Sequence, residues 1–274
     1  MSFTEIDPKY LLPDEVWERI KTAIPPEPPK PKGGRPRMDD RKALNAIFYI
    51  LRTGIQWKAL PRCLGASSTV HDRFQLWAQE GVFVRMWELG LKQYAEEVGL
   101  DLEWMSMDGA MVKAPLGGEA TGPNPTDRAK SGTKRSLLTE GNGIPIGIVL
   151  AGANRHDMKL TEATLASQRL IPGERELGVF WNLCLDKGYD YEEVREILER
   201  WGYVGHIPPR DERKRIIDDI PNYKARRWVV ERTHSWMNRF RRLLIRWEKK
   251  AENYLAMIHL AFTCIVVRGI QVSG

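Results

Sequence analysis

Cysteine is scarce in this sequence. Its 274 residues include three cysteines, Cys63, Cys184 and Cys264, which lie far apart and form no CxxC pair. The pattern excludes a disulfide framework and a cysteine-based zinc site, and it fits a reducing cytoplasm. The first ten residues lack the basic start and apolar run of a secretory signal peptide, so we expect none.

Long hydrophobic runs are also missing. The most apolar stretch, residues 255–267, contains His259 and is too short to span a bilayer, so we expect a buried closing helix and no membrane association. Apolar residues make up 42% of the chain, which is enough to fill a core. The length suits one large or two modest globular domains.

Acidic residues are nearly absent from one region. Between Asp219 and Glu248 the only acid is Glu231. The basic residues there are Lys224, Arg226, Arg227, Arg232, Arg239, Arg241, Arg242 and Arg246. Apolar residues in the stretch 224–247 recur at spacings of three, four and seven, which predicts one long helix with an apolar side facing a core.

Arg227 precedes Glu231 by one helical turn, and this spacing has two interpretations. The first is a solvated ion pair worth roughly 0.3–0.5 kcal/mol. The second is a metal-binding carboxylate among arginines that hold a polyanion. Arg239, on the same stretch, would then contact the same polyanion.

The N-terminal part is predicted to be helical. Residues 13–24 form a short amphipathic pattern, and five prolines between positions 25 and 31 indicate an extended linker. Helices are expected at 39–52, 67–79 and 83–98, with Asp39 and Ser67 as N-caps and Gly54 as a helix stop.

These three helices form either a generic bundle or a helix-turn-helix. In the second case the helix 67–79 would present Thr69, His71 and Arg73 to a DNA major groove. Arg35 and Arg37, in a glycine-rich turn, either enter a minor groove or belong to a plain linker.

The pattern changes near residue 100. Two short apolar segments, 102–108 and 177–185, read as buried strands and are each completed by an aspartate, Asp108 and Asp186. A hairpin is expected from 136–139 and 144–151, helices at 161–170 and 191–201, and a further strand at 203–207. A second basic cluster precedes the hairpin and comprises Arg128, Lys130, Lys134 and Arg135.

The two aspartates and Glu231 suggest a metal site. Such folds gather ligands at strand ends, and a glutamate on a helix has the reach to join them. Three carboxylates without histidine or thiolate partners suit Mg²⁺ or Mn²⁺ rather than zinc. Two such ions would activate a water or a 3′ hydroxyl against a phosphodiester, with the basic clusters on flanking phosphates.

The sequence resembles bacterial insertion-sequence transposases with an Asp-Asp-Glu catalytic set on a ribonuclease-H-like core. The matching segments are MDGAMVKA around Asp108, DRAKSGTKRSLLTEGNGIPIGIVLAGANRHD, LDKGYD around Asp186 and RWVVERTHSWMNRFRRLLIRWE around Glu231. The segment GGRPRMDDRKALNAIFYILRTGIQWKALP is similar to the helix-turn-helix of that family.

This resemblance implies an α/β fold, α+β overall, with a ribonuclease-H-like mixed sheet flanked by helices and preceded by an all-α helix-turn-helix domain. The expected parts are residues 1–32 as a helix and linker, 33–99 as the DNA-binding domain and 100–274 as the catalytic domain. It also implies that Asp108, Asp186 and Glu231 bind two Mg²⁺ or Mn²⁺ ions, and that Arg227 contacts DNA near the scissile phosphate.

The implied function is cleavage of double-stranded DNA at terminal inverted repeats and transfer of the 3′ end to target DNA. The resemblance further implies a homodimer on DNA and a cytoplasmic, nucleoid-associated protein. Two alternatives share these features: a domesticated, catalytically silent DNA-binding regulator, and a structure-specific nuclease with the same core.

Overall fold

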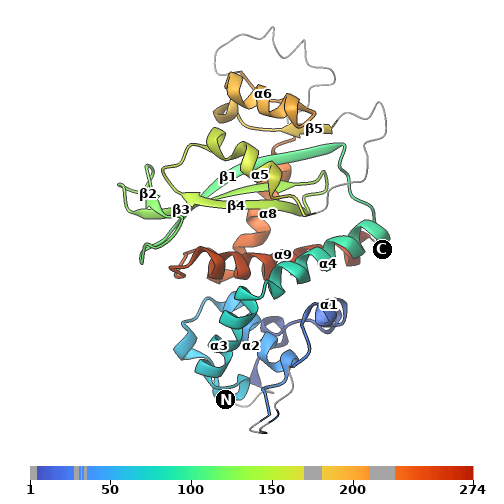
Figure 1. Ribbon diagram of the computed structural model, residues 1–274, viewed down its shortest axis with the longest axis vertical. Coiled ribbons are helices and arrows are strands. Elements are labelled where there is room, and N and C mark those ends of the chain that lie inside the picture. The colour runs from blue at the N-terminus through green and yellow to red at the C-terminus, as the bar shows by residue number, and fades with distance from the viewer. Residues whose placement is uncertain are drawn as a thin grey trace.

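The computed structural model describes residues 5–27, 31, 33, 36–169, 181–209 and 226–273. A mixed sheet with its helices lies above a group of helices from the N-terminal third (Figure 1). Between the two, the long helices α4 (Val82–Glu97) and α9 (Ala251–Ser273) pack side by side. The chain therefore has a helical part and an α/β part joined through one helix pair.

The helical part largely follows the sequence pattern. It contains α1 (Asp14–Ile20), α2 (Asp40–Thr53) and α3 (Ser67–Gln79), followed by α4. The Asp39 carboxylate accepts a hydrogen bond of 2.9 Å from the backbone N–H of Lys42, and Gly54 ends α2 with a φ of 73°. The predicted cap at Ser67 is wrong, since Ala66 precedes α3 and no side chain caps that helix.

The sheet has six strands. They are β1 (Trp104–Lys113), β2 (Gly122–Pro123), β3 (Ser131–Thr139), β4 (Pro145–Gly152), β5 (Trp181–Cys184) and β6 (Tyr203–His206). β3 lies antiparallel to β1, β2 and β4, whereas β5 is parallel to both β1 and β6. An antiparallel β1-β3-β4 meander extended by two parallel strands is the mixed sheet that the resemblance implies.

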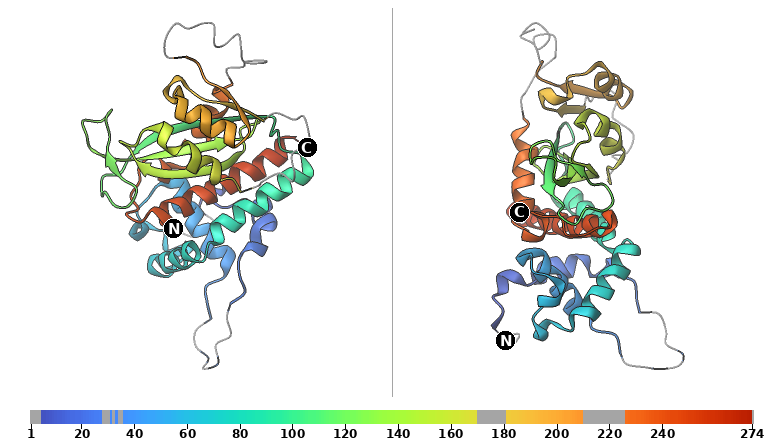
Figure 2. Two further views of the ribbon diagram at one scale, coloured as in Figure 1. Left: turned by 45° about the horizontal axis from the view of Figure 1, so that its top comes forward. Right: turned by 90° about the vertical axis from the view of Figure 1, so that its left-hand side faces the viewer.

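Helices cover both faces of this sheet. Figure 2 shows α8 (Trp228–Asn238) on one face and α5 (Thr161–Ala166) with α6 (Glu192–Arg200) on the other. The α5 helix is shorter than the predicted 161–170, of which residue 170 lies outside the described part. Residues 177–180 of the strand predicted before Asp186 also lie outside it.

The predicted long helix at 224–247 is wrong in its second half. α8 ends at Asn238, Phe240 is extended, and a 3₁₀ turn η8 (Arg241–Leu243) follows. The break lets η8 pack against α2, where the Arg242 guanidinium donates to the carbonyl of Ile55 at 3.1 Å. The apolar stripe is correspondingly divided: Trp228, Leu244 and Trp247 are exposed, whereas Val229, Phe240 and Leu243 are buried.

The core runs through both parts of the molecule. One cluster of buried apolar side chains extends from α1 through α9 to the sheet. By length and composition alone α9 could cross a membrane, yet most of it is buried inside the protein. It packs against α4 and β4, which confirms the predicted closing helix as part of a longer one.

Candidate functional site

The strand register brings Asp108 and Asp186 to the same end of the sheet. β1 pairs with β5 up to Ser106 opposite Cys184, and both aspartates lie two residues beyond that last pair. The prediction that Asp108 ends its strand is wrong, because β1 continues to Lys113 along β3. The neighbouring strand β5 ends at Cys184, and the chain leaves the sheet there. Asp108, within β1, therefore lies beside the segment that carries Asp186.

Arg227 joins two of the three predicted acids. Its Nη2 lies 2.5 Å from Glu231 Oε1, and its Nη1 lies 3.7 Å from Asp186 Oδ2. The hydrogen bond with Glu231 is the main cause of a raised pKa for Arg227, and the charges of Asp108 and Asp186 add to it. The guanidinium therefore lies between Asp186 and Glu231, within the electrostatic reach of Asp108.

Asp108 is the most perturbed acid of this group. Burial raises its pKa from 3.8 to about 6, against the lowering effect of the Gly109 N–H. That N–H donates to Asp108 Oδ1 at 2.8 Å. The charge of Asp186 raises the same pKa further, that of Arg227 lowers it, and that of Asp157 raises it. Asp108 thus shares one electrostatic environment with both neighbours.

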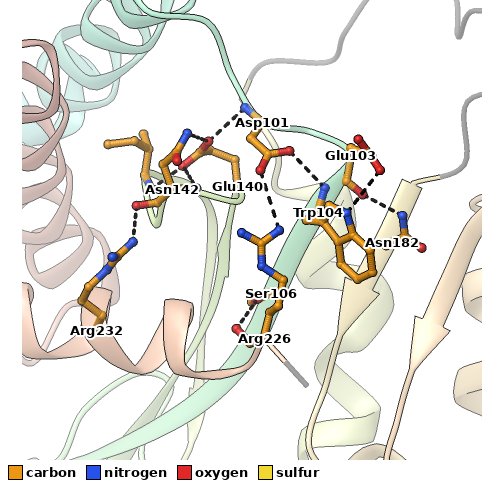
Figure 3. A network of polar contacts seen from close by, with 10 residues as sticks. Asp101, Glu103, Trp104, Ser106, Glu140, Asn142, Asn182, Arg226 and Arg232 are labelled. Atoms are coloured by element: carbon orange, nitrogen blue, oxygen red, sulfur yellow. Dashed lines mark hydrogen bonds and ion pairs between the residues drawn. The ribbon is translucent and has the colours of Figure 1, made fainter. Parts of the chain in front are cut away.

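A polar network fixes the start of α8 against the sheet (Figure 3). The Ser106 hydroxyl on β1 donates to the Arg226 carbonyl at 3.2 Å, and the Arg226 side chain lies 3.9 Å from Asp101. Further along α8, Arg232 donates to the carbonyl of Asn142 at 2.5 Å. These contacts set the position of Glu231 relative to β1.

The turn between β3 and β4 is organised by Glu140. Its buried carboxylate accepts hydrogen bonds from the backbone N–H groups of Asp101, Asn142 and Ile144 at 3.0, 2.7 and 2.8 Å. Burial is the main cause of its raised pKa. These hydrogen bonds, some of which Figure 3 draws, hold the turn that receives Arg232.

The donor chemistry fits a hard divalent cation. Carboxylate oxygens from Asp108, Asp186 and Glu231 suit Mg²⁺ or Mn²⁺, and Arg227 already places a positive charge among them. Within the described ranges no three histidine, cysteine or acidic side chains stand close enough to share an ion as they are. Cation binding would therefore require the three carboxylates to move closer together, with Glu231 released from Arg227.

Two members of the predicted basic cluster are not surface residues. β3 begins at Ser131, so Lys134 and Arg135 belong to the strand and point to opposite faces, where both are buried. Lys134 Nζ lies 2.8 Å from Asp157 Oδ2, and Arg135 donates to the Leu243 carbonyl at 3.5 Å. Their prediction as DNA contacts is wrong for this conformation.

The prediction that Arg73 contacts DNA is also wrong, because this side chain is buried. It is 6% exposed and donates to Asp40 at 2.5 Å, so it braces α3 on α2 instead of reaching outward. Arg37 pairs with the same Asp40 at 2.8 Å. His71 is half-buried, with its ring centroid 4.8 Å from that of Trp57.

The remaining predicted DNA contacts stay predictions. Thr69, Arg128, Lys130 and Arg239 are exposed, and Arg35 lies outside the described residues. His156 and Asp157 match a motif of the family that the sequence resembles and are expected to support the site or to pack within their loop; the charge of Asp157 acts on Asp108. No sequence pattern indicated a cavity of about 820 Å³ between the helical and α/β parts. Its basic lining residues are Lys9, Arg52, Arg232, Arg239 and Arg268, with an apolar floor that includes Trp236 and Phe240.

Two families match the chain. Residues 102–266, more than half of its length, match the family described as "Transposase DDE domain". Residues 12–87 match the family described as "Putative transposase of IS4/5 family". The first match contains Asp108, Asp186 and Glu231, and the second contains α1 to α3.

Individual relatives agree with these families. The chain is 38% identical to the "Putative transposase for insertion sequence element IS402" of Burkholderia cepacia, over 53% of this chain and 67% of that protein. It is 32% identical to an IS402 uncharacterized 16.2 kDa protein of the same organism, over 43% of this chain and 82% of that one. The Mos1 strand transfer complex is a remote structural neighbour, at 12% identity and a TM-score of 0.30 over 94% of this chain and 83% of that one.

Proposed function

Since the chain belongs to the DDE transposases of insertion sequences, we propose that Asp108, Asp186 and Glu231 are its catalytic acids. As a member of this family the protein is a DNA cleavage and strand-transfer enzyme that uses divalent metal. The observation that supports the assignment is that Arg227 pairs with Asp186 and Glu231, while the register of β1 and β5 places Asp108 beside Asp186.

We propose two Mg²⁺ or Mn²⁺ ions as the cofactor, held by these three carboxylates. Bound there, the ions would activate the attacking water or 3′ hydroxyl and stabilise the leaving oxygen. Asp108, on the sheet, and Asp186, at its edge, provide rigidly placed oxygens. Glu231 completes the set from α8, whose start is fixed to β1 by the Ser106–Arg226 contact.

Arg227 has a second role in this proposal. Without DNA it neutralises Glu231 and Asp186, and with DNA its guanidinium would contact a phosphate next to the cleaved bond. Arg227 would thus exchange its carboxylate partners for a DNA phosphate. Release of the two carboxylates would then accompany the arrival of substrate.

The DNA surface would extend along α8 into the arginine-lined cavity. No acid lines this cavity among the described residues, so its charge is complementary to a phosphate backbone. The terminal inverted repeats and the target DNA are the proposed substrates. Residues 33–99 are the proposed DNA-binding domain and 100–274 the catalytic domain, acting as a homodimer on DNA in the cytoplasm.

A cleavage assay with the Glu231→Gln variant tests the assignment. The DNA flanking the gene supplies the inverted repeats for the substrate. We expect the wild type to cut and join this DNA in Mg²⁺, and the variant to bind it without cutting. Cleavage by the variant would show that Glu231 is not a catalytic acid. Wild-type cutting without joining would indicate the structure-specific nuclease, and binding alone the silent regulator.

A further inference from the structure

Asp157 lies directly behind the Asp108 backbone. A Cβ atom added at Gly109 would lie 2.1 Å from Asp157 Oδ1 and 3.2 Å from its Cγ. The carboxylate therefore rests on the backbone of the residue that follows Asp108, and any side chain at that position would have to displace it. This contact links the 3₁₀ turn η6 (Asp157–Leu160) to the middle of β1.

The two oxygens of Asp157 have different environments. Oδ2 accepts a hydrogen bond from Lys134 Nζ at 2.8 Å, and the Lys134 side chain is only 7% exposed. Oδ1 is fully buried and has no hydrogen-bond partner among the described residues. A buried carboxylate oxygen without a donor is costly, and a nearby cation would offset that cost.

The turn that contains Asp157 packs against the turn that follows Asp186. This second 3₁₀ turn, η7 (Lys187–Tyr189), is capped by Asp186 and ends at Tyr189, whose side chain is 1% exposed. Burial raises its pKa well above the usual value, and the charges of Asp157, Asp108 and Asp186 raise it further in that order. The packing of η6 on η7 thus brings Asp157 into the same electrostatic environment as Asp108 and Asp186.

We propose that Asp157 is a positioning residue of the catalytic site, which holds the Asp108–Gly109 segment in place and adds a fourth negative charge that strengthens divalent-cation binding. The inference rests on the assignment of Asp108 and Asp186 as cation ligands. Asp157 does not bind the ion itself. The ion pair with Lys134 orients the Asp157 carboxylate and partly neutralises its charge.

The test measures Mn²⁺ affinity by calorimetric titration of the full chain, without DNA. Asp157→Asn removes the charge and keeps the shape, and we expect affinity to fall about 10-fold. That variant leaves Lys134 buried without its partner, so loss of stability alone could explain a weaker site. A second variant, Lys134→Met with Asp157→Leu, replaces the pair by apolar side chains and should fold about as stably as the wild type.

The pair-replaced variant separates the two roles. A purely structural ion pair predicts wild-type Mn²⁺ affinity once stability is restored, and that result overturns the inference. The positioning role predicts an affinity that stays about 10-fold low. Arg242 and Glu248 form a matched control, since they are a buried pair at 2.7 Å with one unpartnered carboxylate oxygen outside this site. Their replacement by Met and Leu should leave Mn²⁺ affinity unchanged.

An Asp108→Asn variant distinguishes this inference from the proposed function. Mn²⁺ binding that survives in Asp108→Asn contradicts the metal site itself, and the inference falls with it. Binding that requires Asp108 but is the same in the wild type and the pair-replaced variant overturns only the role of Asp157. Gly109→Ala gives a further check, because its methyl group must displace the Asp157 carboxylate and should also weaken binding.

Discussion

The catalytic proposal depends first on single residues whose environment opposes folding. Asp108 is half-buried near two other carboxylates, and its pKa of about 6 reflects the cost of ionising it there. A cation would remove that cost, because it supplies the missing positive charge. The residue is thus suited to metal binding and unfavourable in the metal-free protein.

The first prediction concerns Asp108→Asn in the presence of EDTA. The folded-state pKa is raised from 3.8 to about 6, so the carboxylate destabilises the fold above pH 6 and has no such effect below pH 4. At pH 7.5 the variant should be more stable by about 3 kcal/mol, in line with 1.36 kcal/mol per pKa unit. Urea denaturation at pH 7.5 and pH 4 measures this, and an equal gain at both pH values would contradict it.

Arg227 gives a second prediction at the residue scale. Because it occupies the space between Asp186 and Glu231, Arg227→Met should raise the Mn²⁺ affinity of the DNA-free protein about 2- to 5-fold, the effect of an exposed ion pair. The same change should weaken binding of end DNA. Arg200→Met is the matched control, since Arg200 pairs with Glu162 at 2.9 Å on α6. Unchanged Mn²⁺ affinity in Arg227→Met would show that Arg227 does not compete with the cation.

At the scale of elements, the site is created by strand register and one helix. The sequence patterns predicted both apolar strands and their aspartates, and they singled out Glu231 as the lone acid of a basic stretch. They left open whether the first strand continues past Asp108 toward Val112, because residues 109–113 carry no apolar alternation that distinguishes strand from loop. The pairing with β3, a long-range interaction, decides it.

The errors at Lys134 and Arg135 have a similar cause. Consecutive basic residues read as a solvated cluster, yet in a strand they point to opposite faces. Tertiary partners determine that both are buried: Asp157 on one side and the η8 carbonyls on the other. The end of α8 at Asn238 likewise depends on the packing of η8 against α2. The spacing of apolar residues in the sequence does not predict such a contact.

The third prediction tests how α8 is attached to the sheet. Thr233 is fully buried, and its hydroxyl donates to the Gly143 carbonyl at 2.6 Å. Thr233→Val keeps the shape but leaves that carbonyl unpaired, so we expect a loss of about 1–3 kcal/mol in unfolding free energy and slower DNA cleavage. Ser235→Ala, on the exposed face of α8, should change stability by less than about 0.5 kcal/mol. Equal effects of the two changes would rule out this anchoring contact.

At the scale of the whole molecule, the helical part and the α/β part share one core through α4 and α9. The arginine-lined cavity lies between them, with Arg52 from α2, Arg239 after α8 and Arg268 from α9. DNA bound there would contact both parts at once. Recognition of the end and placement of the scissile phosphate would then be linked geometrically.

The fourth prediction follows from that arrangement. Arg239→Gln and Arg268→Gln should each lower affinity for end DNA and reduce the slope of log affinity against log salt by about 1. Fluorescence anisotropy from 50 to 200 mM salt measures the slope. Arg200→Gln, on the distant α6, should leave it unchanged. If Arg239→Gln and Arg268→Gln gave the same slope as Arg200→Gln, the DNA would not bind in the arginine-lined cavity.

The most direct test of the central claim is the metal dependence of an Asp186→Cys variant in DNA cleavage. A thiolate binds the harder Mg²⁺ poorly and softer cations better. If Asp186 is a metal ligand, the variant should be inactive in Mg²⁺ and regain cleavage of inverted-repeat DNA in Mn²⁺. Cleavage at the wild-type rate in Mg²⁺ would show that Asp186 holds no metal, and would contradict the account.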